Sequence, residues 1–133
     1  MSRLESCQRR ITKWCKPISH LSYPDRLKRL HLPTVESRFK RGDLILTYRI
    51  LHHLIDIPPS EFFCMTETNT RGHNLRLAGQ HSHLNIRHRF FTERVVSFWN
   101  SLETVGVNSP SVNSFKAYLD KVRKFETYLD KVL

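Results

Sequence analysis

The basic side chains are the residues of this chain best suited to chemistry, because clustered Lys and Arg can neutralise nucleic-acid phosphates. The chain of 133 residues carries 22 Lys and Arg against 12 Asp and Glu, a formal net charge of +10. Residues 1–60 hold 12 of these Lys and Arg against five Asp and Glu. Phosphate contacts are predicted at Arg9, Arg10, Lys13, Arg26, Lys28, Arg29, Arg38, Lys40 and Arg41, and beside a predicted hairpin at Arg71, Arg76 and Arg87.

Contacts of this kind are blind to base sequence and sensitive to salt, and they do not distinguish RNA from DNA. Tyr23 and Trp14 lie among the basic residues, and an exposed aromatic ring can stack on an unpaired base. A solvated surface, the ordinary role of Lys and Arg in soluble proteins, explains the same pattern without a ligand.

Metal and cofactor chemistry has little support in the sequence. Cys7, Cys15 and His20, or His81 with His83, carry ligand atoms, but structural zinc sites use tighter paired spacings. We therefore expect buried thiols and surface histidines, with no metal and no cofactor. Three cysteines at irregular spacing favour reduced thiols and an intracellular protein, in the nucleus or cytoplasm.

Catalytic and membrane classes are also disfavoured. The Asp and Glu residues are scattered, and no Ser or His stands in a recognisable arrangement of nucleophile and base. The longest apolar run, residues 44–48, is far too short to span a bilayer. We expect a protein that is neither an enzyme nor bound to a membrane.

Three helices are predicted to position the basic half of the chain. Residues 3–16 form an amphipathic helix with Leu4, Cys7, Ile11, Trp14 and Cys15 on one side, and Pro17 ends it. A short helix begins near Ser22, and Thr34 caps a long helix that continues to about Leu54. Gly42, inside the long helix, predicts close approach of another element.

An aromatic helix is predicted to be the centre of the fold. Its large apolar residues share one broad side at Phe90, Phe91, Val95, Phe98, Trp99 and Leu102. The alternation in residues 73–77 and 81–87 predicts a β-hairpin, and Gly106 is expected in a loop. A lone hairpin is marginal in water, so it must pack on the aromatic helix.

The last helix is predicted to begin at Ser109 and Pro110 and to carry a heptad seam. The seam residues are Phe115, Tyr118, Val122, Phe125, Leu129 and Val132. They suit either self-association or packing on the chain's own core, which makes an oligomerisation module the alternative function.

These elements predict a mainly α fold with one small hairpin. We expect four to five helices, with the two-stranded hairpin packed on the aromatic helix. A single domain is expected over residues 1–122, and residues 123–133 are expected to extend the last helix.

Several segments, collinear over roughly residues 4–122, resemble the region after the thumb in reverse transcriptases of non-long-terminal-repeat retrotransposons. The similar segments are residues 8–13, 21–30, 32–38, 41–51, 70–77, 85–87, 90–91, 94–102 and 110–115. Cys7 and Trp14 depart from the family pattern, and residues 125–132 look like an added copy of residues 115–122.

The resemblance implies a non-catalytic accessory region that binds RNA or DNA, alone or with the rest of a reverse transcriptase. Such polymerases use paired palm aspartates, and this sequence contains no Asp-Asp pair. No catalytic residue is therefore assigned. A working product and a remnant of a retroelement are both consistent with the sequence.

Overall fold

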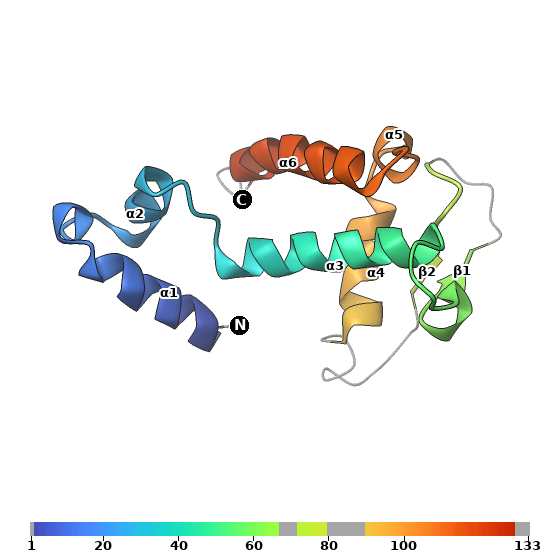
Figure 1. Ribbon diagram of the computed structural model, residues 1–133, viewed down its shortest axis with the longest axis horizontal. Coiled ribbons are helices and arrows are strands. Elements are labelled where there is room, and N and C mark those ends of the chain that lie inside the picture. The colour runs from blue at the N-terminus through green and yellow to red at the C-terminus, as the bar shows by residue number, and fades with distance from the viewer. Residues whose placement is uncertain (1, 67–71, 80–89, 130–133) are drawn as a thin grey trace. The chain divides into compact units, whose positions relative to one another are not determined.

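A computed structural model describes residues 2–66, 72–79 and 90–129 and is mainly helical, with a small antiparallel hairpin (Figure 1). The predicted fold class is therefore confirmed. The α-helices are α1 (Ser2–Trp14), α2 (Tyr23–Arg29), α3 (Val35–Leu51), α4 (Phe91–Asn100), α5 (Thr104–Val107) and α6 (Val112–Leu129). Short 3-10 turns are η1 (Lys16–Ile18) and η2 (Pro59–Glu61), and the strands are β1 (Cys64–Met65) and β2 (Leu77–Ala78).

The chain divides into two compact units, unit 1 (residues 1–42) and unit 2 (residues 43–133). A single domain over residues 1–122 therefore stays a prediction. Within the described ranges, no helix is both long enough and apolar enough to cross a bilayer.

Local capping explains where α2, α3 and α6 begin. The Ser22 hydroxyl accepts a hydrogen bond from the Asp25 amide, and Thr34 Oγ1 accepts one from the Ser37 amide at 3.1 Å. Both helix starts were predicted. The start of α6 was not, because Ser111 caps it by accepting from the Ser114 amide at 3.2 Å. Ser109 instead donates to the Gly106 carbonyl at 2.7 Å.

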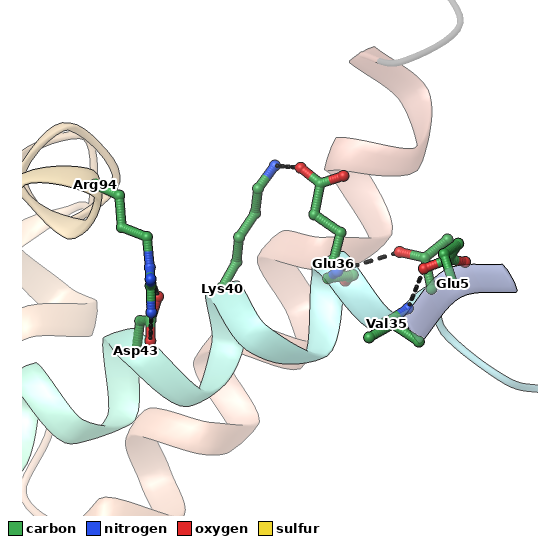
Figure 2. Close-up of polar contacts among 8 residues, drawn as sticks. Glu5, Val35, Glu36, Lys40, Asp43 and Arg94 are labelled. Atoms are coloured by element: carbon green, nitrogen blue, oxygen red, sulfur yellow. Dashed lines mark hydrogen bonds and ion pairs between the residues drawn. The ribbon is translucent and has the colours of Figure 1, made fainter. Parts of the chain in front are cut away.

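In unit 1, α1 packs against the rest of the unit through its polar side. Gln8 and Thr12 are buried, and Gln8 Nε2 donates to the Pro33 carbonyl at 2.9 Å. Glu5 accepts from the Val35 amide at 2.9 Å (Figure 2), which ties α1 to the start of α3. The apolar side of α1, with Leu4, Cys7, Ile11 and Trp14, is exposed. An amphipathic helix normally buries its apolar side, so this one is reversed.

Unit 2 has a conventional apolar core centred on α4. Trp99 is fully buried beside Phe115, at 6.0 Å between ring centroids, and Phe115 stacks on Tyr48 at 4.5 Å. The aromatic helix α4 thus lies at the centre of this core, as predicted, but the set of its buried residues needs a correction. Phe90 precedes α4 and is mostly exposed, whereas Val96, which the pattern omitted, is buried.

The hairpin pairs differently from the predicted one. Met65 faces Leu77 and Cys64 faces Ala78 in the antiparallel pair of β1 and β2. The predicted second strand, residues 81–87, lies outside the described residues. The expected packing on α4 is present, because the Asn100 amide accepts from the Leu77 N–H at 2.9 Å and donates to its carbonyl at 2.8 Å.

A bidentate ion pair joins α4 to the part of α3 that belongs to unit 2 (Figure 2). The Arg94 guanidinium donates to the two Asp43 carboxylate oxygens at 2.6 and 2.9 Å. The hydrogen bond that Arg94 donates to Asp43 raises the pKa of Arg94. Paired hydrogen bonds fix geometry as well as charge, so this contact sets where α4 crosses α3.

Candidate nucleic-acid interface

The positive charge follows the division into units. Residues 1–42 contain 11 Lys and Arg against three Asp and Glu, a surplus of eight. Residues 43–133 contain 11 against nine, a surplus of two. Unit 1 therefore supplies most of the net charge of +10 although it is the smaller unit. The charge asymmetry seen in the sequence is thus concentrated on one compact body.

The three acidic residues of unit 1 are all occupied locally. Glu5 accepts from the Tyr23 hydroxyl at 2.5 Å and from the Val35 amide. Desolvation and this bond to Glu5 raise the pKa of Tyr23. Asp25 accepts from the Ser22 hydroxyl and lies 3.9 Å from Lys28, and Glu36 pairs with Lys40 at 3.1 Å. Most cations of unit 1 are therefore not neutralised by carboxylates of the same unit.

Several exposed cations make no ion pair with any residue that the structure describes. They lie on α1, η1 and α2, and they are Arg3, Arg9, Arg10, Lys13, Lys16 and Arg29. Arg3 and Lys16 were absent from the predicted site, although the helical pattern already placed them outside the apolar side of α1. Exposed, unpaired cations on neighbouring turns are the arrangement that phosphate binding needs.

Arg26, a predicted phosphate ligand, is instead a structural residue. Its side chain is buried, and the guanidinium donates to the Leu21 carbonyl at 2.6 Å, to Thr12 Oγ1 at 3.3 Å and to the Arg9 carbonyl at 3.4 Å. These bonds hold α1 against α2. The sequence pattern could not distinguish Arg26 from Lys28 and Arg29, because all three are basic and lie in the same turn of one short helix.

The neighbouring pair Arg26 and Arg29 offers a direct test of this assignment. Arg26→Ala should destabilise the fold by about 2 kcal/mol, because buried carbonyls lose charged donors. Arg29→Ala should change stability by less than about 0.5 kcal/mol, because the side chain is exposed. Urea unfolding followed by far-UV circular dichroism measures both. Equal unfolding midpoints for the two variants would contradict a structural role for Arg26.

The other cations of the predicted phosphate site differ in their exposure and in the contacts that they already make. Arg38 is exposed and donates to the Gln8 side-chain oxygen, and Lys28 and Lys40 make the ion pairs given above. Arg41 and Arg76 are partly buried and have contacts of their own. Arg71 and Arg87 lie outside the described residues. The candidate interface is therefore narrower than the sequence suggested and is centred on α1 and α2.

The two aromatic side chains of the basic region are placed very differently. Arg9 and Arg26 lie over the Tyr23 ring, with guanidinium carbons 4.9 and 5.7 Å from its centroid. Cation–π contacts of this kind engage the ring within unit 1. Trp14, by contrast, is 73% exposed at the end of α1. Of the two predicted stacking residues, Trp14 is the accessible one.

The thiols differ from expectation in their burial, whereas the described histidine of the predicted set does not. Cys7, Cys15 and Cys64 are free and exposed, so the prediction of buried thiols is wrong. His20 is exposed as predicted, and His81 and His83 lie outside the described residues. His73, which was not among these histidines, is buried, and its Nε2 donates to the Trp99 carbonyl at 3.0 Å. Among the described residues, no three His, Cys, Asp or Glu side chains are grouped to hold a metal ion.

The first part of the heptad seam is used inside unit 2. Phe115 is fully buried, and Tyr118 packs partly against the core and accepts from the Glu103 amide at 3.1 Å. The Phe125 and Leu129 side chains and the whole of Val132 lie outside the described part of the chain. The described seam residues therefore favour internal packing, and self-association stays a prediction.

Comparison with protein-family models, with curated proteins and with solved structures found no match to this chain.

Proposed function

We propose that this chain is a non-catalytic accessory region that binds RNA or DNA through the phosphate backbone. The observation that carries the proposal is the surplus of eight positive charges on unit 1. The resemblance to the post-thumb region of retrotransposon reverse transcriptases points the same way. In that context the chain would hold template or product for a polymerase domain that it does not itself contain.

The contacts expected to carry binding are the exposed cations of α1 and α2. Arg10 and Lys13 lie one turn apart on α1, and Arg29 lies in the last turn of α2. Each phosphate neutralised releases counterions, so binding is expected to weaken steeply with salt. No base-specific contact is proposed, because long flexible cations do not by themselves read a sequence.

Charge reversal on unit 1 is the test of this function. The double variant Arg10→Glu with Arg29→Glu should lower affinity by about tenfold or more at low salt, because two phosphate contacts become repulsive. The slope of log affinity against log salt should fall by about 1.4 to 1.8. Filter binding of labelled RNA and DNA at about 50 and 200 mM salt measures both quantities.

A matched reversal on unit 2 separates local binding from net charge. Arg49 and Lys121 are exposed, and Arg49→Glu with Lys121→Glu changes the total charge by the same amount. This control should retain affinity to within about threefold, because long-range charge is screened at these salt concentrations. Equal losses in the two double variants would argue against an interface on unit 1. Absence of binding by the wild type at low salt would contradict the proposal itself.

A further inference from the structure

The exposed side of α1 combines two rows of side chains that run along the helix. One row is apolar and contains Leu4, Ile11 and Trp14, which are 51%, 57% and 73% exposed. The second row contains the exposed cations Arg3, Arg10 and Lys13. Helical spacing places the rows next to each other, because Arg10 and Trp14 are four residues apart and Arg3 and Cys7 are likewise.

The two rows are both exposed because α1 packs against the rest of unit 1 through Gln8 and Thr12 on its polar side. Gln8 and Thr12 hold the helix to the Pro33 carbonyl and to Arg26, so the apolar row faces away from unit 1's interior. Leu4 and Trp14 are ten residues apart, which is about 15 Å along a helix. At the spacing of about 3.4 Å between stacked nucleotides of one strand, this length matches about four nucleotides.

Resting on the proposed function, we propose that α1 binds single-stranded nucleic acid, with Trp14 stacking on an unpaired base. Arg10 and Lys13 would contact the phosphates that flank this base, and Ile11 and Leu4 would lie against the bases that follow it. Sites for single strands combine cations that track the backbone with apolar or aromatic side chains that contact base faces. A duplex hides its base faces by pairing and stacking, so it engages only the cationic row.

Charge also decides between occupants of this surface. A second copy aligned parallel along α1 would bring Arg3 and Arg10 against their own counterparts, and an antiparallel copy would bring Arg3 near Lys13 of the second copy. Such like-charge pairs are unfavourable in either orientation. An anionic lipid surface would suit the apolar row of α1. It would not need the further exposed cation Arg29 on α2, whereas a nucleic-acid strand can continue onto it.

The tryptophan fluorescence of the full chain provides a first test of the proposal. Trp14 is exposed and Trp99 is fully buried, and these are the two tryptophans of the sequence. Oligo(dT) of about 15 nucleotides should quench the emission of Trp14, because stacking on a base brings the rings into contact. Trp14→Phe should abolish the quenching and keep most of the affinity, since Phe can still stack.

Affinity measurements on Trp14→Ala give the decisive comparison. Affinity for oligo(dT) should fall by about fivefold to a hundredfold, the range found when a stacking ring is removed. Affinity for the corresponding duplex should stay within about twofold, because the cationic row is intact. Val105→Ala, which removes an apolar side chain that is 78% exposed on unit 2, is the matched control and should change neither affinity.

The possible results separate this inference from the proposed function. Equal binding of oligo(dT) and duplex, with no effect of Trp14→Ala, would overturn the stacking proposal and leave phosphate binding intact. Failure of the wild type to bind either probe at low salt would overturn both. A blue shift of Trp14 emission with phosphatidylcholine–phosphatidylserine vesicles, without quenching by oligo(dT), would assign α1 to a lipid surface and overturn the proposal.

Discussion

Trp99→Ala is expected to destabilise unit 2 by about 3–5 kcal/mol, because it removes the largest fully buried side chain of the core. The indole also donates from Nε1 to the Leu75 carbonyl at 2.7 Å, and its own backbone carbonyl accepts from His73. The residue therefore fixes the segment before β2 as well as filling the core. A small domain has a total stability of about 5–15 kcal/mol, so this loss leaves unit 2 marginally folded.

The second tryptophan provides the matched control. Trp14→Ala removes the same number of atoms from an exposed position and should change stability by less than about 0.5 kcal/mol. Urea unfolding followed by far-UV circular dichroism compares the two variants without relying on tryptophan emission. Trp99→Phe should fall between them, because it retains an aromatic ring but leaves the Leu75 carbonyl without its donor. Similar unfolding midpoints for Trp14→Ala and Trp99→Ala would mean that α4 is not the centre of the core.

Helix positions were predictable wherever local chemistry determines them. Ser22 and Thr34 cap their helices as expected, because a side-chain oxygen next to free amides acts over a few residues of sequence. The start of α6 was assigned two residues too early, because Ser109 and Ser111 carry the same signal. Which of two serines becomes the cap depends on the contact of Ser109 with α5, which no local pattern reveals.

The side on which a helix packs was harder to predict. The sequence pattern placed Leu4, Ile11 and Trp14 on one side of α1 but did not say which side is buried, and unit 1 buries Gln8 and Thr12. The reason lies in tertiary hydrogen bonds, since Arg26 and the Pro33 carbonyl supply partners that a periodicity rule does not count. The same bonds remove Arg26 from the candidate interface and leave Trp14 accessible.

The candidate site was predictable as a region but not residue by residue. Charge counting located the surplus in the N-terminal half, and unit 1 contains eight of the ten excess positive charges. Burial and ion pairing in the folded chain then distinguish cations that look alike in sequence, such as buried Arg26 and exposed Arg29. The hairpin shows the same limit, because β1 is too short to produce a recognisable alternation.

Gly106→Ala is expected to destabilise unit 2 by about 1–2 kcal/mol, although alanine is normally the better helix former. Gly106 lies within α5, not in the predicted loop, and a methyl group there would overlap the Tyr118 ring at Cδ1, Cε1 and Cζ. The ring cannot move freely, because its hydroxyl accepts from the Glu103 amide and it stacks near Phe115. Thermal unfolding followed by circular dichroism measures the loss.

Gly42→Ala is the matched control for this prediction. Gly42 was expected to permit close helix approach, but nothing in the described chain lies within 4 Å of a methyl group at this position of α3. Alanine there should stabilise the helix by up to about 1 kcal/mol, because it lowers the backbone entropy lost on folding. In the background of Tyr118→Ala, Gly106→Ala should also become neutral or stabilising, since the overlapping ring is gone. A stabilising Gly106→Ala in the wild-type background would show that Tyr118 does not occupy this site.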